Sequence, residues 1–322
     1  DLLPADFVPG SNPGDFSFTG APLGAFTLTG QTVAADGQVD LAQGDEIVIT
    51  IVGTLGNSVE PGQVIVNEAD LTWSSIDDQG GEPTDEERDG SGGVNDYGDS
   101  DDATLTVPQV AIAKTVIATS ASHTGDGEGS VGVTDLTIGE TVTYHIVVTV
   151  PEGQIGALDI VDQLPVAADG QVLQLVSYSI RDDLSDVTYS GSTLTPSNSD
   201  ADGGGINDRL EVSLTGVESP VGGNRQIVIE VTALVVNADE NRAGDAATNR
   251  ATVSYTDGEG QSQSYSAEVD VDLVEPALAV DKTVDQASGQ DAGDTVTYTL
   301  TISHAPGSSA DGRVGQTSSA GV

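Results

Sequence analysis

The sequence predicts an all-β fold built from tandem β-sandwich modules, one of them complete and two of them partial. Two observations predict the β-class: apolar residues alternate strictly with Thr, Ser and charged residues, and Gly, Asp and Asn interrupt these runs. The alternation is clearest over residues 142–150 and 227–235. A third observation, a long internal repeat, predicts the modules. No stretch shows the apolar stripe of an amphipathic helix.

The repeat gives the order of the modules. PQVAIAKTV at 108–116 matches PALAVDKTV at 276–284, and each is followed by a turn and a strand, GETVTYHIVVTV from Gly139 and GDTVTYTLTISH from Gly293. Later segments also recur, namely 1–4 with 162–165, 44–55 with 224–235, and 66–74 with 248–256. We therefore expect the late part of a module at 1–107, a whole module at 108–275, and the early part of another at 276–322.

Two explanations fit this order. The chain is a window cut from a longer array of repeats, or segment 276–322 of one chain completes the half-module 1–107 of the next by strand donation. In either case the partners are copies of the same chain or adjacent repeats. We expect a mature portion, because the sequence shows no signal peptide.

Composition points outside the cell and excludes several function classes. The chain has nine basic and 52 acidic residues, for a net charge of −43, so nucleic acid and anionic membranes would repel it. It has no Cys, which excludes disulfides and thiolate metal sites. No apolar run approaches the length of a membrane span, so direct membrane insertion is not expected. Simple solubility through charge is the alternative reading of the acidic excess.

Three kinds of polar residue fall on apolar strand faces. The chain has only two lysines, Lys114 and Lys282, at equivalent places in the repeat, and the alternation points both inward. The same test points Asn249, Asn67 and Asp162 inward. Each would cost several kcal/mol, about 2 or more, if buried without a partner.

Two arrangements would remove this cost. A neutral lysine amine can attack an Asn side-chain amide, while a protonated carboxyl group polarises the amide and shuttles protons. Ammonia leaves and an isopeptide bond remains, in a single self-reaction. The alternative is an unreacted buried Lys–Asp ion pair, with the Asn bonded to backbone groups.

The motifs K-T-V, G-[ED]-T-V-T-Y, D-x-L-P and a late N-x-A-x-[VL] strand resemble a known family. They are similar to the Ig-like conserved-repeat and fimbrial isopeptide-forming domains of microbial surface proteins, of the collagen-adhesin B type. The resemblance implies an Ig-like sandwich in which Lys114 and Asn249 are linked and Asp162 is the catalytic helper. In the partial modules it assigns the lysine to Lys282, and the Asn and Asp to Asn67 and Asp1.

Acidic, Gly-broken loops are a second signal. Such loops suit Ca²⁺, which takes six to eight oxygen ligands at flexible geometry. Calcium is the only cofactor we expect, and solvated turns are the alternative. The candidate ligands are Asp89, Asn95, Asp96, Asp99 and Asp101 in the first loop and Asp200, Asp202, Asn207 and Asp208 in the second, with a sparser group at Asp126, Glu128 and Asp135.

These observations favour a structural role, as the repeat region of an extracellular surface fibre, pilus-like filament or adhesin stalk. The alternative is a calcium-dependent adhesin module that binds a glycan, ice or another cell. The three histidines are scattered, and no P-loop, dinucleotide motif or nucleophile elbow is present, so we do not expect an enzyme. Trp73 falls on the inward parity and is expected in a core.

Overall fold

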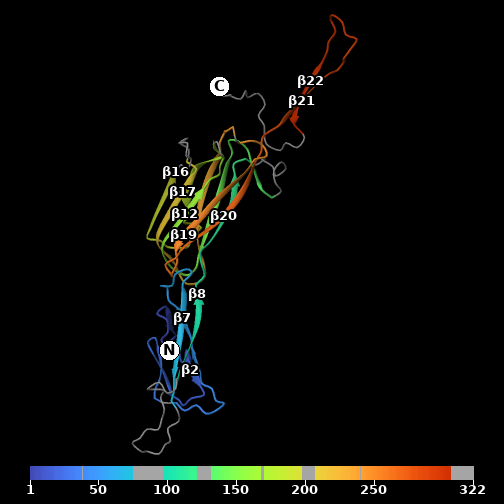
Figure 1. Cartoon of the computed structure of the whole chain (residues 1–322). Coiled ribbons are helices and arrows are strands. Elements are labelled where there is room, and N and C mark those ends of the chain that lie inside the picture. Colours follow the sequence, from blue (N-terminus) through green and yellow to red (C-terminus); the bar gives the residue numbers. More distant parts are fainter. Residues whose placement is uncertain are drawn as a thin grey trace, which may run out of the picture.

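The chain forms an elongated molecule whose three parts follow one another end to end (Figure 1). The computed structural model describes residues 1–37, 39–74, 97–121, 132–167, 170–197, 207–239 and 241–305. All secondary structure within these ranges is β, and none of it is a helix that could cross a membrane. The predicted all-β class, with one complete and two partial sandwiches, is confirmed.

The strands are short in the first part and long in the second. In the first they are β1 (Phe7–Pro9), β2 (Phe16–Thr19), β3 (Phe26–Thr29), β4 (Thr32–Ala35), β5 (Val48–Ile51), β6 (Gly53–Leu55), β7 (Val64–Thr72) and β8 (Gly98–Thr106). In the second they are β9 (Ala111–Thr119), β10 (Thr134–Leu136), β11 (Thr141–Val150), β12 (Gly153–Gln163), β13 (Val166–Ala167), β14 (Gly170–Gln171), β15 (Leu173–Ile180), β16 (Gly191–Ser197), β17 (Arg209–Ser219), β18 (Arg225–Val235), β19 (Ala246–Thr256) and β20 (Ser262–Leu273). The third part holds β21 (Leu278–Val284) and β22 (Tyr298–His304).

Two sheets make up the central sandwich. One has six strands in the order β10-β20-β19-β12-β17-β16, and the other has four in the order β15-β18-β11-β9. Neighbouring strands are antiparallel, except that β10 runs parallel to β20. The first strand of the module, β9, therefore lies at an edge of the smaller sheet, beside β11.

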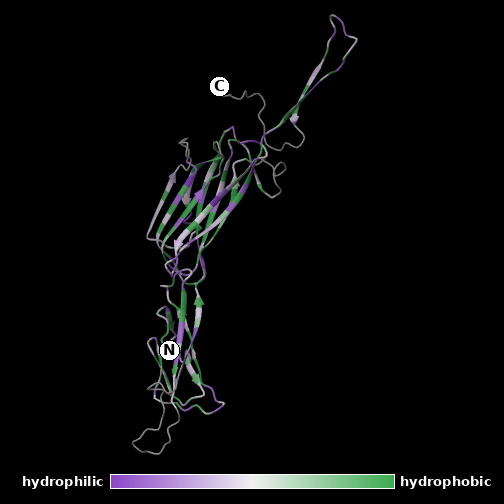
Figure 2. Ribbon diagram, viewed as in Figure 1, coloured by the Kyte–Doolittle hydropathy of each residue, from purple (hydrophilic) through white to green (hydrophobic). Residues whose placement is uncertain are grey.

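The alternation in sequence becomes a dry core between these sheets. Apolar and polar residues alternate along the central strands in Figure 2. On β11, Val142, Tyr144, Ile146 and Val148 have no exposed surface, because they face the inner side chains of β12, β17 and β19. Burial of this apolar surface is the main source of the module's stability.

The N-terminal unit repeats half of this architecture. Its strands form the pairs β1–β6, β2–β5, β3–β4 and β7–β8. Phe16 lies opposite Ile51 on β5, at the place that Tyr178 and Val231 occupy in the central module. The buried cluster of the unit is small, namely Val59, Ile65 and Val107 with Leu55 packed against them.

The N-terminal unit meets the central module through hydrogen bonds and a close backbone approach. Gln154 donates its backbone N–H to the Val59 carbonyl at 3.0 Å, and Val64 donates its backbone N–H to Glu259 Oε1 at 2.9 Å. Gly153 has φ of +127°, and a Cβ on it would lie 2.1 Å from the Val59 carbonyl oxygen. Only glycine permits this approach.

Beyond β20 the chain ends its described part in a lone hairpin. Among the residues that the structure describes, β21 and β22 pair only with each other, with Lys282 opposite Leu300. Figure 1 shows the hairpin projecting from the sandwich at the end remote from the N-terminal unit. The expected module boundaries, 107/108 and 275/276, fall between β8 and β9 and between β20 and β21.

Candidate cross-link site

Lys114, Asp162 and Asn249 converge between the two sheets of the central sandwich. Lys114 lies on β9 of the smaller sheet, whereas Asp162 and Asn249 lie on the neighbouring strands β12 and β19 of the larger one. All three are buried, with exposures of 7%, 1% and 0%. The inward orientation that the alternation predicts for them is therefore confirmed.

Lys114 is bonded to Asp162 inside the core. Its Nζ donates a hydrogen bond to Asp162 Oδ1, and it lies 5.1 Å from the centroid of the Tyr144 ring. Tyr144 is a member of the site that the sequence reasoning did not single out. A signal was present, because a tyrosine stands at the same place in the other copy of the repeat, at Tyr298.

Burial controls the charge of this pair. Removal from water lowers the pKa of Lys114 and raises the pKa of Asp162, and in both cases it outweighs the attraction between the partners. Burial also raises the pKa of Tyr144. The neutral amine and the protonated carboxyl group are therefore the forms that the core favours.

The side-chain amide of Asn249 lies beside Lys114 and Asp162 in the core, and it makes no well-formed hydrogen bond. Asn249 lies near enough to both Asp162 and Tyr144 to oppose, through side-chain hydrogen bonding, the rise in pKa that burial causes in each of them. Its Oδ1 and Nδ2 atoms nevertheless make no hydrogen bond of good geometry, and neither does Asp162 Oδ2. Unpaired buried polar atoms are rare and costly. An amine, a carboxyl group and an amide are the three groups that the isopeptide reaction requires, and the core holds all three together.

The partial copies divide the same set of residues between them. In the N-terminal unit, Asn67 Nδ2 donates to Asp1 Oδ2 at 3.3 Å, and the other carboxyl and amide oxygens of this pair are buried without a partner. The alternation predicts an inward Lys282, but this prediction is wrong for the described structure: Lys282 is exposed, because β21 and β22 pair only with each other in the described part of the chain. Its Nζ lies 4.8 Å from the Tyr298 ring centroid.

The acidic-loop residues do not form a cluster in the part of the chain that the structure describes. Asp99 and Asp101 are exposed on β8, and Asp208 is buried and pairs its backbone N–H with the Ser197 carbonyl. No group of three or more His, Asp or Glu side chains suited to a metal is found among the described residues. Calcium binding stays a prediction; Asp89, Asn95, Asp96, Asp126, Glu128, Asp200 and Asp202 lie outside the described ranges.

Trp73 corrects one sequence expectation. It was expected in a core but is 44% exposed and contacts Tyr97, with the ring centroids 6.2 Å apart. Within the described ranges of the chain, β7 and β8 pair only with each other. Leu71, which shares the parity of Trp73, is 61% exposed as well, so the face that was expected to be inward is not buried at this end of β7.

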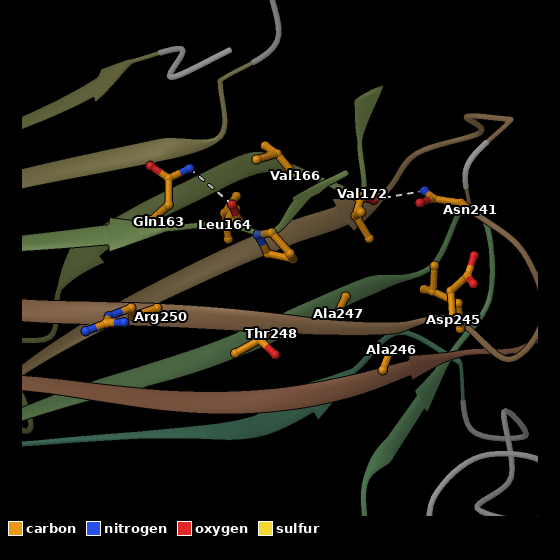
Figure 3. Close-up of a pocket in the computed structure, with 12 residues that line it drawn as sticks. Gln163, Leu164, Val166, Val172, Asn241, Asp245, Ala246, Ala247, Thr248 and Arg250 are labelled. Atoms are coloured by element: carbon orange, nitrogen blue, oxygen red, sulfur yellow. Dashed lines mark hydrogen bonds between the residues drawn. The ribbon is translucent and has the colours of Figure 1, made fainter. Parts of the chain in front are cut away.

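A cleft of about 550 Å³ opens at one end of the sandwich, beside Leu164 and Val172 (Figure 3). Its polar side chains are already engaged within the protein. Gln163 and Asn241 donate to backbone carbonyls, and the remaining three bond to nearby residues of the same sheet or loop: Asp245, Thr248 and Arg250. The cleft therefore offers no polar side chain that is free to bind a ligand among those named here.

No family profile and no curated protein matches the sequence. Similar solved structures include a cohesin module from a family 33 glycoside hydrolase of Clostridium perfringens (9% identity, TM-score 0.28, covering 51% of this chain and 99% of that one). They also include the major pilin BcpA of Bacillus cereus (11% identity, TM-score 0.34, covering 78% of this chain and 63% of that one). A third is the major pilin SpaD of Corynebacterium diphtheriae (17% identity, TM-score 0.32, covering 82% of this chain and 58% of that one). The chain thus spans less than two thirds of either pilin, and similarity at this level concerns the fold alone.

Proposed function

We propose that this chain is a structural segment of a cell-surface fibre or adhesin stalk, and that Lys114 and Asn249 of its central module become joined by an isopeptide bond. The observation that carries the proposal is the buried triad: an amine bonded to a carboxyl group, beside an amide whose polar atoms have no partner. The extended arrangement of the parts supports the stalk assignment (Figure 1).

The reaction follows from the charge states that burial favours. The neutral amine of Lys114 attacks Cγ of Asn249, and a C–N bond forms. Asp162, protonated, donates a hydrogen bond to the amide oxygen and so stabilises the charge that develops there. A proton from the attacking nitrogen passes by way of Asp162 to the leaving group, the Cγ–Nδ2 bond breaks, and ammonia departs. One amide replaces another, so no oxidant or cofactor is required.

The position of the bond suits a segment under tension. Lys114 lies on the first strand of the module and Asn249 on the strand before the last, in opposite sheets. A pull applied at the two ends of the module would therefore pass from β9 to β19 through the bond. The strands between them in sequence would carry none of the force, and the module would keep its fold.

Intact-mass measurement of the full chain tests the proposal. We expect the monomer to be lighter than its sequence by at least one ammonia, and a digest to yield a branched peptide that contains residues 114 and 249. The Lys114→Ala variant should regain that ammonia and lose the branched peptide. A wild-type chain of full mass, with Lys114 and Asn249 in separate peptides, would refute the cross-link.

A further inference from the structure

One titratable side chain at the cross-link site takes no part in the proposed reaction. Tyr144 lies on β11 with no exposed surface, and its hydroxyl is buried without a hydrogen bond. A buried hydroxyl that makes no hydrogen bond costs stability. Phenylalanine would fill most of the same space in the core without that cost, so the hydroxyl calls for a role beyond packing.

The unpaired polar atoms of the core gather around this hydroxyl. Tyr144 Oη, Asp162 Oδ2 and both polar atoms of the Asn249 side chain are buried without a well-formed hydrogen bond. Tyr255 shows the contrast, because its hydroxyl is also buried in the module but accepts a hydrogen bond from the Val110 backbone N–H at 3.3 Å. The lack of a partner is therefore a property of the Tyr144 site and not of every buried tyrosine in the module.

Tyr144 lies close to each of the reacting groups. The Lys114 Nζ is 5.1 Å from the centroid of its ring. Its hydroxyl lies near enough to Asn249 for side-chain hydrogen bonding, and near enough to Asp162 to feel the charge of that carboxyl group. Tyr144 belongs to the smaller sheet, whereas Asp162 belongs to the larger sheet with Asn249. The amide thus has one acidic group from each sheet beside it.

The phenol of Tyr144 is in the form that donates a hydrogen bond. Burial raises the pKa of this hydroxyl, and the charge of Asp162 raises it further, so the proton stays on the oxygen near neutral pH. Neither end of the Asn249 amide is held by a hydrogen bond. A half-turn about Cβ–Cγ can therefore present its oxygen to the phenol, and an amide oxygen accepts where the amide nitrogen only donates.

The proposed chemistry leaves a place for such a donor. When the lysine amine attacks Asn249 Cγ, negative charge develops on Oδ1, and donors aimed at that oxygen stabilise the transition state. Asp162 is one donor, but it also passes a proton to the leaving nitrogen. While that proton moves, Asp162 cannot donate it to the oxygen. A second donor that keeps its own proton would stabilise the charge throughout the step.

We propose that Tyr144 is a further catalytic residue of the cross-link reaction, and that its hydroxyl donates a hydrogen bond to Asn249 Oδ1 while Lys114 attacks. This inference rests on the proposed function and adds a fourth residue to the same site. The Nζ–Cγ bond forms, the Cγ–Nδ2 bond breaks, and ammonia leaves with the proton that Asp162 relays. The phenol proton remains on Tyr144 from start to finish.

The test compares the rates at which Tyr144→Phe and the wild-type full chain lose ammonia. The substitution keeps the ring beside Lys114 and removes only the hydroxyl. Each chain is made by cell-free translation, translation is stopped, and the intact mass is followed with time. Loss of one such donor slows a reaction by about 10²-fold, and we expect a slowing of that order. Tyr255→Phe is the matched control, because it removes a buried hydroxyl elsewhere in the module, and it should react at the wild-type rate.

A second replacement separates chemistry from packing. Tyr144 is replaced, by codon suppression, with a tyrosine fluorinated next to its hydroxyl. The fluorine makes the phenol a stronger hydrogen-bond donor, and burial keeps it protonated near neutral pH. Ammonia loss should then be faster than in the wild type, whereas disturbed packing would make it slower.

A rate for Tyr144→Phe equal to or above that of the wild type would overturn the inference and leave the proposed function standing. Slow reaction in both the Phe variant and the fluorinated chain would overturn it too, because disturbed packing would explain both results. If the wild-type chain keeps its full mass, the cross-link chemistry itself fails, and the role of Tyr144 fails with it.

Discussion

Replacement of Asn249 by Ala separates a linked module from an unlinked one by the size of its effect on stability. Both Asn249 polar atoms are buried and lack a hydrogen bond of good geometry. In an unlinked module their removal relieves the folded state of unpaired polar groups, while the cavity left in the core costs stability. The two effects oppose each other, so the net loss should stay below about 2 kcal/mol. In a linked module the same substitution also abolishes a covalent constraint and must lower the stability by more.

The magnitude follows from the length of chain that the bond encloses. Between Lys114 and Asn249 the loop holds about 135 residues, for which the chain-entropy relation developed for disulfides gives about 5 kcal/mol. In a module of this size each kcal/mol moves Tm by roughly 2–4 °C, so we expect Asn249→Ala to lower the Tm of the central module by about 10–20 °C.

Scanning calorimetry of the full chain, paired with intact mass on the same sample, makes the measurement. Asn241→Ala is the matched control, because Asn241 is also buried but donates hydrogen bonds to the Val172 and Val236 carbonyls. We expect this control to lose about 1–3 kcal/mol, from the two orphaned acceptors, and to keep its ammonia deficit. A loss of Tm in Asn249→Ala no larger than that in Asn241→Ala would refute the reasoning.

Two further predictions concern packing and pH. Ile146→Ala should destabilise the central module by about 3–5 kcal/mol in urea unfolding. Leu300→Ala, at the equivalent but 58% exposed place on the hairpin, should change the stability of the chain by no more than about 0.5 kcal/mol, and equal losses for the two variants would contradict the exposure of the hairpin. The hydrogen bond from His145, together with Arg181, holds the pKa of Glu230 in the folded protein below its usual range. Ionised Glu230 therefore stabilises the fold at pH values above the ordinary Glu pKa of about 4.3. This stabilisation is lost as the pH falls through the pKa that Glu230 has in the folded protein. The stability difference between wild type and Glu230→Gln should shrink over that acid range in urea titrations, and a difference that grows on acidification would contradict the assignment.

The sequence carried most of the information about the central module and less about its neighbours. Alternation over residues 142–150 and 227–235 predicts two strands that each have one apolar face. The residues on these faces are fully buried, because both faces lie between the two sheets of the central sandwich. The same parity placed Lys114, Asp162 and Asn249 inside. It could not show that Trp73 would be exposed, since parity selects a face and says nothing of what covers that face.

Other features leave no periodic signal. The parallel pairing of β10 with β20 joins a three-residue strand to one far along the chain. The junction between the first two parts depends on backbone contacts of Val59 and Gly153 and on the side-chain carboxylate of Glu259, which lie in turns and strand ends. Such contacts are set by where the loops happen to meet, and that depends on the finished fold.

The distribution of cations has a consequence for the reactivity of the chain. Among the described residues, the ion pairs that arginine makes on the surface use Arg181, Arg209, Arg225 and Arg250. A guanidinium keeps its proton and is not a nucleophile, so it supplies charge without competing for an Asn amide. The nucleophilic side-chain amines are confined to Lys114, which is buried, and Lys282, which is exposed. A lysine-specific protease would therefore cut the folded chain at Lys282 alone, and once Lys114 has joined Asn249 it would cut at no other lysine even after unfolding.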